Sequence, residues 1–517
     1  MRCLQCSYKY NACKMHAQTP LQAATMSHII GCHLSRHGLS CHLPRVSTRS
    51  CAKEGCERPD NMHAFGKDST VYLGIDIGTS KCAAVVVSND GALQASSSLP
   101  HNGGTPSPDG HAEQDPELLL QAAADAVRQL PADLRHEVQK VGVTGQMHGV
   151  VVVDDALRPL TPLVTWQDQR CLRTESFLPE LQERTGYRLQ TGYGCATLAW
   201  LINAHELPAG AVSSGTVHDL LVARLCGLSQ MITDETDAAS FGLFSLADLY
   251  WDRKAITAAG IRPQLLPSVV PSGGTAGKLT DPMAADLGLR AGIPVCVALG
   301  DNQASLMATL EHPEEELALT LGTGGQLSAV VPAMTAGGDD DARFEYRPYP
   351  GLRYLAVAAS LCGGAAWAWL VDTAGAWCTA LGVQPPPRDD IFSRLDALGL
   401  EADTTLRIRP HFLGERNAPD LRGSIEGIDL TNMDLGAVAR ALATGIIRSF
   451  VDRLPANALA KRRTIVCSGN ALRKSALLRR AVEETFGLPV RLGAECEEAA
   501  VGAALLARRG LQVPGID

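Results

Sequence analysis

No run of apolar residues in this 517-residue sequence approaches the roughly 20 residues that a membrane-spanning helix needs. A concentrated basic patch is also lacking, and the formal net charge is −9, which argues against binding to nucleic acid. We therefore expect neither a membrane nor a nucleic acid as a partner. Hydrophobic residues make up 45% and charged residues 20% of the chain, which is an ordinary globular composition, and the length allows two or three domains.

Several common catalytic and nucleotide-binding motifs are also missing. The segment Gly273 to Lys278 resembles a P-loop but lacks its first glycine and the Ser or Thr that should follow the lysine. No G-x-G-x-x-G follows a predicted strand, and neither H-E-x-x-H nor G-x-S-x-G occurs. These absences argue against a P-loop NTPase, a Rossmann dehydrogenase, a zinc protease and an α/β-hydrolase.

The first 61 residues differ from the rest of the chain. They hold seven of the 16 cysteines, five histidines and eight Lys or Arg against three acids, without helical or strand periodicity. Cys3 and Cys6 have zinc-ligand spacing, but no second pair with the spacing of a finger or ribbon follows. We expect residues 1–69 to be a disordered Cys/His-rich extension; a targeting peptide and a true translation start at Met62 are the alternatives.

The other nine cysteines are scattered singly along the chain. This distribution is typical of buried, reduced thiols, so we expect a cytoplasmic protein.

The stretch Val71 to Leu93 is predicted to form a β-hairpin. An apolar run leads into Asp76, a polar turn follows, and a second β-branched run ends at Asp90-Gly91. Glycine in the turn lets a ligand approach the backbone, and the turn could offer donors to phosphate oxygens from Gly78, Thr79, Ser80 and Lys81. Asp76 would then hold a hydrated magnesium ion. The alternative is an ordinary hairpin with a glycine turn.

A second hairpin of the same kind is predicted far downstream. The strand Leu317 to Leu321 runs into Gly322-Thr323-Gly324 and then into another apolar strand. Two such hairpins, at the starts of two halves of similar size, indicate two related domains that each contribute a phosphate-binding turn to one interdomain cleft. A chance glycine-rich turn is the alternative.

Polar side chains follow two segments in the first half of the chain. Gln146, Met147 and His148 lie between glycines at the end of a predicted strand, where open α/β sheets place ligands. Trp166 and Asp168 lie in a second segment, in which an aromatic ring could cover the C–H face of a sugar while polar groups bind its hydroxyls. A tight turn with a satisfied histidine is the alternative for the first segment.

A third strand end, Gly300-Asp301-Asn302-Gln303, precedes a predicted helix. A carboxylate there could accept a proton from a substrate hydroxyl, or Asp301 could simply be a helix N-cap. In the second half, Gly363-Gly364 begins a predicted helix, and the small residues of Ser468-Gly469-Asn470 would admit an adenine ring.

Seven motifs in this order resemble the FGGY carbohydrate kinase family over roughly residues 70–510, and we quote them as they stand: GIDIGTS (74–80), GQMHG (145–149), TWQDQR (165–170), GDNQ (300–303), LGTGGQ (321–326), GERNAPDLRG (414–423) and CSGNALRKS (467–475). Within the family, VTWQDQRC, TGYGCATLAWL, GTVHDLLVARLCGL and FLGERNAPDLRG are most similar to kinases of sedoheptulose, with kinases of xylulose as the alternative. One departure is Ser468-Gly469, where members of the family often have two glycines.

The resemblance implies an α/β protein with the two-domain actin/Hsp70/sugar-kinase (ribonuclease H-like) fold and an interdomain cleft. The sugar-binding domain would span residues 70–309 and the nucleotide-binding domain residues 310–517. It also implies ATP and Mg2+ as cofactors and phosphorylation of the terminal hydroxyl of a ketose, with a non-enzymatic ATPase or a sugar sensor as alternatives. We expect a monomer or a homodimer.

The resemblance also assigns roles to individual residues. Asp301 would be the catalytic base, with Asp76 at the magnesium ion. Gln146, Met147, His148, Trp166, Asp168 and Asn302 would bind the sugar. The cofactor would bind at Gly78, Thr79, Ser80, Lys81, Gly322, Thr323, Gly324, Gly364, Gly469 and Asn470.

Overall fold

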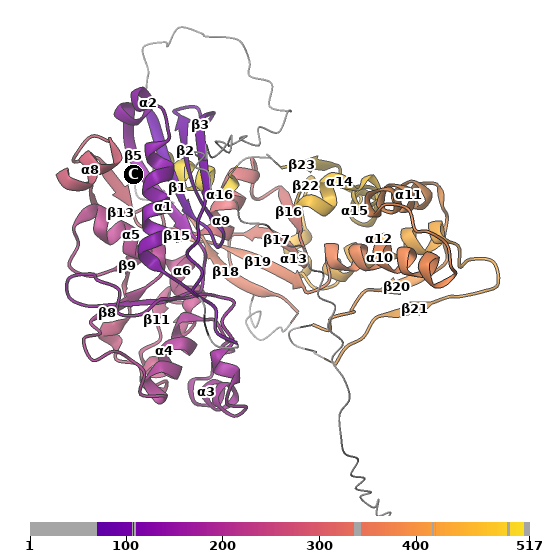
Figure 1. The fold of residues 1–517 in the computed structure, drawn as a ribbon, viewed down its shortest axis with the longest axis horizontal. Helices are drawn as coiled ribbons and strands as arrows, with labels where there is room; N and C mark the ends of the chain where they lie inside the picture. Colours follow the sequence, from indigo (N-terminus) through magenta and orange to yellow (C-terminus); the bar gives the residue numbers. More distant parts are fainter. Residues whose placement is uncertain are drawn as a thin grey trace, which may run out of the picture. The chain divides into compact units, whose positions relative to one another are not determined.

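The computed structural model describes residues 70–510 except 106, 108–109, 336–342, 416–417, 419 and 494–496 (Figure 1). The predicted extension, residues 1–69, and its cysteines and histidines lie outside the described residues. We call residues 70–309 the first half and residues 310–510 the second half. Each half contains one large sheet.

The sheet of the first half has the strand order β13-β14-β5-β1-β2-β3, with β15 paired to β5. Its strands are β1 (Val71–Ile77), β2 (Lys81–Ser88), β3 (Leu93–Pro100), β5 (Val138–Gly145), β13 (Thr275–Lys278), β14 (Pro294–Cys296) and β15 (Leu299–Gly300). The predicted hairpin is confirmed, since β1 and β2 pair antiparallel from Val71–Ser88 to Ile77–Cys82. β5 joins the other edge of β1 in parallel.

The sheet of the second half repeats this arrangement. Its order is β18-β19-β17-β16-β22-β23, from the strands β16 (Glu316–Leu321), β17 (Gly325–Val331), β18 (Glu345–Tyr349), β19 (Arg353–Ser360), β22 (Thr464–Ser468) and β23 (Val490–Leu492). In each sheet an antiparallel hairpin is followed by a third antiparallel strand, and parallel strands extend the other edge. The shared strand order accounts for the two similar hairpins in the sequence.

Helices cover both faces of the first sheet. α1 (Pro116–Arg128) and α5 (Val217–Cys226) pack on one face, and α16 (Glu498–Arg509) packs on the other against β1, β2 and β5 (Figure 1). α16 lies so close that a Cβ added to Gly74 would come within 1.9 Å of the carbonyl oxygen of Ala500. The last described helix of the chain therefore packs on the sheet of the first half, although it follows the second half in sequence.

The helices of the second half form the other large core. They are α10 (Gly364–Ala380), α11 (Arg388–Glu401), α12 (Leu435–Val451), α13 (Ala456–Leu459), α14 (Asn470–Lys474) and α15 (Ala476–Phe486). Trp367 and Phe450 are fully buried between them and the sheet.

Two segments differ in detail from what their sequence patterns predict. The sequence from Arg473 to Phe486 predicts one helix, but it is interrupted at Ser475, because the Ser475 hydroxyl accepts a hydrogen bond from the Leu478 N–H (2.9 Å) and so starts α15 as a new helix. The apolar run from Pro294 to Leu299 predicts one strand, but it forms two short strands, β14 and β15, each paired with β5.

Residues between β5 and β13 form a smaller core of their own around Val152, Leu198 and Phe241. The remaining helices are α2 (Ala132–Glu137), α3 (Phe177–Thr185), α4 (Gly194–Asn203), α6 (Glu235–Phe241), α7 (Arg253–Ala258), α8 (Asp281–Leu287) and α9 (Asp301–Thr309), with 3-10 turns at Arg170–Leu172 and Pro263–Leu265. The remaining strands are β4 (Glu113–Gln114), β6 (Val151–Val153), β7 (Leu163–Val164), β8 (Ser213–Gly215), β9 (Ile232–Thr233), β10 (Phe244–Ser245), β11 (Tyr250–Trp251), β12 (Ser268–Val269), β20 (Arg407–Arg409) and β21 (Ser424–Glu426).

Candidate active site

The carboxyl ends of three neighbouring strands bring the main candidate residues together. Asp76 in β1 lies opposite Thr144 in the parallel strand β5. Gly300 in β15 lies opposite Gly145, the last residue of β5. Asp76, Asp301 and the turn that begins with Gln146 therefore share one edge of the first sheet, which is where sheets of this type bind ligands.

Asp76 has a buried side-chain oxygen, Oδ1, without a hydrogen-bond partner among the described residues. Burial, together with repulsion from Asp301 and Glu497, raises the pKa of this carboxyl group from 3.8 to about 8, although Lys81 acts to lower it. A carboxylate oxygen of this kind fits the requirement of a cation for oxygen ligands. No group of three or more His, Cys, Asp or Glu side chains in the described part of the chain could hold a metal ion. A single carboxylate of this kind fits an ion that keeps most of its water, as magnesium does.

Asp301 is the first residue of α9, and Gly300 is its N-cap. The prediction that Asp301 could be an N-cap is therefore wrong, because the preceding residue takes that position. Burial raises the pKa of this half-buried carboxyl group, and although His218, the Asn302 N–H and Arg347 act to lower it, the pKa rises from 3.8 to about 6. A carboxylate with such a pKa near neutrality is suited to accept a proton from a hydroxyl group.

The turn of the first hairpin is connected to both predicted sugar-binding segments. The Thr79 hydroxyl accepts a hydrogen bond from Trp166 Nε1 (3.1 Å) and donates one to Gln146 Oε1 (3.4 Å). Gln114 completes the network: its Oε1 accepts from Gln146 Nε2 (2.8 Å), and its Nε2 donates to the Thr79 carbonyl oxygen (2.7 Å). The structure thus brings Thr79, Gln146 and Trp166 together, with the Trp166 ring 45% exposed to solvent.

Met147 packs against Gly300, and His148 stacks on Tyr193. A Cβ added to Gly300 would lie 2.6 Å from Met147 Cε, so the thioether packs directly on the residue before Asp301. His148 has a φ of 71°, a left-handed conformation that is rare outside glycine, and its Nδ1 lies 2.7 Å from the Ser240 carbonyl oxygen. The imidazole and the Tyr193 ring lie 4.6 Å apart, so two flat side chains are held together directly after Met147.

Asp168 lies in a different environment from the one expected for a sugar ligand. It is fully buried, and its carboxylate accepts hydrogen bonds from Ala112 N (2.8 Å) and from Arg170 Nε (2.8 Å). Arg170 in turn contacts Glu113. These bonds hold the segment that carries Trp166 in place, and they occupy both oxygens of Asp168.

The other residues predicted at this edge have different surroundings. Ser80 is exposed, and Lys81 Nζ lies 2.7 and 2.8 Å from the two carboxylate oxygens of Glu497, directly before α16. Gly78 donates its N–H to the Lys81 carbonyl oxygen (3.0 Å), which closes the turn. Asn302 has a buried Nδ2 without a hydrogen-bond partner among the described residues.

A second cluster forms at the hairpin of the second half. Gly364 N donates to the Gly322 carbonyl oxygen (2.8 Å), and Ala365 N donates to the Thr323 carbonyl oxygen (2.9 Å). A Cβ added to Gly469, which has a φ of 89°, would lie 2.3 Å from the Leu321 carbonyl oxygen.

The structure therefore collects all six residues predicted for the nucleotide in the second half: Gly322, Thr323, Gly324, Gly364, Gly469 and Asn470. Three of them, Gly322, Thr323 and Asn470, are exposed to solvent.

Three residues near the first cluster, Gln114, Arg347 and Asp237, were not predicted by the sequence analysis. Gln114 follows a polar loop and has no motif around it. Arg347 lies in β18, in the second half; burial acts to lower the pKa of its guanidinium group, but the ion pair with Glu345 and the nearby Tyr193 and Asp301 raise it. Asp237 lies 2.8 Å from His218 in a buried pair.

The end of β18 is joined to the start of α9, because Gln303 Nε2 donates a hydrogen bond to the carbonyl oxygen of Pro348 (3.0 Å).

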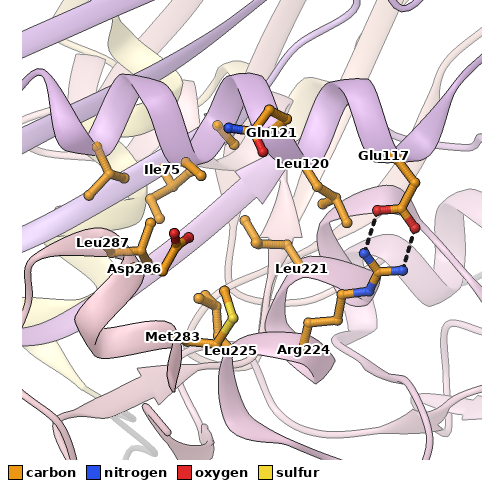
Figure 2. Close-up of a pocket in the computed structure, with 13 residues that line it drawn as sticks. Ile75, Glu117, Leu120, Gln121, Leu221, Arg224, Leu225, Met283, Asp286 and Leu287 are labelled. Carbon is orange, nitrogen blue, oxygen red and sulfur yellow. Dashed lines mark hydrogen bonds and ion pairs between the residues drawn. The ribbon is translucent and has the colours of Figure 1, made fainter. Parts of the chain in front are cut away.

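A pocket of about 180 Å³ lies between α1, α5 and α8, away from these clusters (Figure 2). Leu120, Leu221 and Leu225 line it, and the ion pair between Glu117 and Arg224 lies at one end. Ile75 also lines it, and because side chains alternate along a strand, Ile75 points to the opposite face of the sheet from Asp76. None of the predicted site residues lines this pocket.

Comparison with known proteins tests the family. Residues 71–308 match the N-terminal domain of the FGGY family of carbohydrate kinases, and residues 317–511 match its C-terminal domain. The chain belongs to this family. The predicted resemblance is thereby confirmed, and the protein is an ATP-dependent carbohydrate kinase.

The relatives of this FGGY kinase include the sedoheptulokinase of Homo sapiens, which is 34% identical over 478 residues, covering 85% of this chain and 97% of the relative. The xylulose kinase of Staphylococcus xylosus is 26% identical over 457 residues, 85% of this chain and 91% of the relative. A solved xyloylose kinase from Brucella ovis superposes with a TM-score of 0.72 at 23% identity, covering 85% of this chain and 90% of that chain. The predicted actin/Hsp70/sugar-kinase fold is confirmed. Among the described residues, no helix of this FGGY kinase is both long and apolar enough to cross a membrane.

Proposed function

We propose that this carbohydrate kinase transfers the γ-phosphoryl group of ATP to the terminal hydroxyl of sedoheptulose, giving sedoheptulose 7-phosphate. The proposal is supported by the human and mouse sedoheptulokinases, which are 34% and 32% identical over most of their length, against 26% for a xylulose kinase. Xylulose is therefore the second candidate. Trp166 and the stacked pair of His148 and Tyr193 support a sugar substrate, because they bring flat side chains to the two segments proposed to bind it.

The observation that carries the mechanism is the position of Asp301. Its carboxylate is half-buried and follows Gly300, on which Met147 packs. A sugar held at Met147 and His148 would place its terminal hydroxyl beside this carboxylate, which then acts as the general base.

The sugar ligands proposed are Gln146, Met147, His148, Trp166 and Asn302. The unpaired Asn302 Nδ2 supports its inclusion, since a buried donor needs a partner and a sugar hydroxyl could supply one. For Asp168 we propose a supporting role: it orients the segment that carries Trp166, because its oxygens already accept bonds from Ala112 and Arg170.

The nucleotide would bind at the two glycine turns. We propose phosphate contacts from Gly78, Thr79, Ser80, Lys81, Gly322, Thr323 and Gly324, and adenosine contacts near Gly364, Gly469 and Asn470. Asp76 would hold the magnesium ion, which when bound neutralises negative charge on the phosphates. We also propose a sugar-binding domain at 70–309 and a nucleotide-binding domain at 310–517, with α16 packed on the first sheet.

The proposed reaction is an in-line displacement. The terminal hydroxyl oxygen of the sugar forms a bond to the γ-phosphorus, the bond from the γ-phosphorus to the β–γ bridging oxygen breaks, and ADP leaves. The proton of the hydroxyl passes to the Asp301 carboxylate. Positioning and charge stabilisation account for most of the catalysis in this type of transfer, so the protein mainly has to align the two substrates.

A panel of substrates with ATP tests the proposal. We expect kcat/KM, followed as ADP release, to be highest for sedoheptulose, lower for xylulose, and lowest for gluconate and glycerol. A preference for xylulose would replace sedoheptulose with the second candidate. Asp301→Asn keeps the shape of the side chain and should lower kcat by about 100-fold or more while sugar binding persists. Turnover near the wild-type rate would contradict the role of Asp301.

We further propose a cytoplasmic enzyme that is a monomer or a homodimer. The eight cysteines in the described part of the chain are all free, which supports a reducing compartment. Light scattering of the purified protein would distinguish the two oligomeric states.

A further inference from the structure

His218 and Asp237 form a fully buried pair that the proposed reaction does not use. His218 lies in α5 and Asp237 in α6, and His218 Nε2 is 2.8 Å from Asp237 Oδ2, with both side chains 0% exposed. A histidine and a carboxylate are costly to bury, and the cost is offset only by specific partners. The position of the pair suggests what it does.

The other ring nitrogen of His218 faces the strands that carry Asp301. A Cβ added to Gly145 would lie 2.5 Å from His218 Nδ1, so glycine at this position leaves room for the ring. Gly145 is paired with Gly300, the residue before Asp301. His218 Nδ1 is buried and has no hydrogen-bond partner among the described residues.

The start of α6 fixes the same backbone from a second direction. The Thr236 hydroxyl accepts a hydrogen bond from Gly300 N (2.9 Å) and donates one to Asp234 Oδ1 (2.7 Å). Asp234 also caps α6 by accepting from Asp237 N (3.0 Å). One short helix therefore holds both the residue that pairs with His218 and the backbone that presents Asp301.

We propose that His218 and Asp237 are a positioning pair that acts on the reaction through Asp301, holding its backbone and adjusting its charge without touching the sugar. This proposal rests on the proposed role of Asp301 as the base.

The charged groups around Asp301 also support the proposal, because the two members of the pair act on Asp301 with opposite signs. Four charged or titratable groups face it: His218 from α5, Asp237 from α6, Arg347 from β18 and Asp76 from β1. His218 lowers the pKa of Asp301, whereas Asp237 and Asp301 repel each other; burial and, after it, this repulsion raise the pKa of Asp237. Burial lowers the pKa of His218 itself. The two members of the pair therefore have opposite effects on Asp301: His218 favours its ionised form, and an ionised Asp237 opposes it.

Two nearly isosteric variants separate these effects. Asp237→Asn removes the repulsion between residue 237 and Asp301. The fall of kcat/KM on the acid side of its pH profile, the acid limb, should therefore move to lower pH. His218→Gln keeps a donor toward Asp237 but removes the imidazole, so the limb should move to higher pH. We expect each shift to be on the order of one pH unit, with the dissociation constant of the sugar changed less than about twofold. The profile is measured from about pH 5 to about pH 9 at saturating ATP and magnesium, with the best sugar of the panel.

Asp396→Asn is the matched control. Asp396 also accepts backbone and hydroxyl hydrogen bonds, from Ala476 N (3.1 Å) and Ser475, but it lies in the second half. Asp396→Asn should leave the acid limb of the kcat/KM profile at the same pH. A purely structural role of the pair would lower activity in both variants without opposite shifts, and shifts in one direction or none would overturn the proposal.

A second measurement leaves the pair itself unchanged and so does not depend on how the His218 and Asp237 variants fold. The ring-nitrogen NMR signal of His218 should show an inflection near the pKa of Asp301, about 6, and Asp301→Asn should abolish it. An unchanged His218 titration would overturn the proposal. If Asp301→Asn is inactive but the His218 titration is the same in this variant as in the wild type, only the proposed role of the pair is wrong. If Asp301→Asn stays active, the proposed function is wrong.

Discussion

Thr144 Oγ1 donates a 2.7 Å hydrogen bond to the carbonyl oxygen of Leu299, although the two residues lie 155 positions apart in the chain. The bond joins the end of β5 to β15, and β15 leads directly into Asp301. It therefore fixes the distance between the base and the turn at Met147 and His148. The same edge of the sheet carries Asp76, so the proposed metal ligand and the proposed base are set by one group of parallel strands.

The first prediction concerns the pH dependence of the wild-type enzyme. Burial raises the pKa of Asp301 to about 6, and an acid with a raised pKa stays protonated to higher pH. A protonated Asp301 cannot accept the hydroxyl proton, so kcat/KM should fall about tenfold for each pH unit below about pH 6. The measurement is the pH profile of kcat/KM for the sugar at saturating ATP. A profile that stays flat through pH 6 would contradict the assignment of Asp301.

Local patterns in the sequence were enough to predict the two hairpins and the strand ends that carry Gln146 and Asp301. Alternating apolar residues specify a strand, and a glycine turn specifies its reversal, so each hairpin is encoded within a few residues. The start of α1 is encoded as locally, by Asp115 as N-cap and Pro116 at the first helical position.

Long-range contacts could not be predicted in this way. Nothing in the sequence around Arg347 shows that β18 will bring it toward Asp301, because the pairing depends on the order of strands in the second sheet. The packing of α16 on β1 depends likewise on two small residues, Gly74 and Ala500, that meet only in the folded chain. Long-range contacts also change the role of Asp168. Its carboxylate was predicted to bind sugar, but in the structure it accepts hydrogen bonds from Ala112 and Arg170.

The second prediction concerns Trp166. Its ring is 45% exposed, and its Nε1 donates to the Thr79 hydroxyl, so the ring is held in one orientation beside the first turn. Trp166→Ala removes the apolar surface that would cover the sugar, and we expect the sugar dissociation constant to rise at least about tenfold. Trp166→Phe keeps a ring but loses the hydrogen bond, which should cost about 1 kcal/mol, or roughly fivefold in affinity. Calorimetric titration with the sugar measures both.

Trp377→Phe is the control for this prediction. Trp377 is 53% exposed in α10, in the second half, and its replacement by Phe should leave sugar binding unchanged. Equal losses in the Trp166 and Trp377 variants would indicate a general effect on stability and would remove Trp166 from the sugar site.

The third prediction concerns the ion pair between Lys81 and Glu497. The lysine is 49% and the glutamate 15% exposed, so the pair itself should contribute at most about 1 kcal/mol to stability. If Lys81 also contacts the phosphates of ATP, Lys81→Met should raise the KM for ATP several-fold, whereas Glu497→Gln, which frees the lysine, should not. Steady-state kinetics with varied ATP distinguish the two.

The matched control is the pair of Arg388 with Asp372, which are 59% and 60% exposed and joined at 2.7 Å. Arg388→Met breaks it and should change neither the KM for ATP nor kcat. Parallel effects of Lys81→Met and Glu497→Gln on the KM for ATP would mean that the pair acts as a structural link and that Lys81 is not a phosphate ligand.

The fourth prediction uses two glycines of the second turn. A Cβ added to Gly322 meets no atom within 4 Å, whereas a Cβ added to Gly364 would lie 2.4 Å from the Gly322 carbonyl oxygen. Gly322→Ala should therefore leave the melting temperature nearly unchanged, and Gly364→Ala should lower it. If the phosphates of ATP approach the backbone at Gly322, the new methyl group will crowd them, and the KM for ATP should rise about tenfold or more in Gly322→Ala.

The two variants together separate ligand contact from folding. Thermal unfolding without ligand reports the effect on the fold, and the added stability from saturating ATP reports binding, because a ligand that binds only the native state raises its stability. Gly322→Ala should melt like the wild type without ATP and lose most of the shift with ATP. A full ATP shift in that variant would place the phosphates elsewhere, since the space in front of Gly322 is otherwise open.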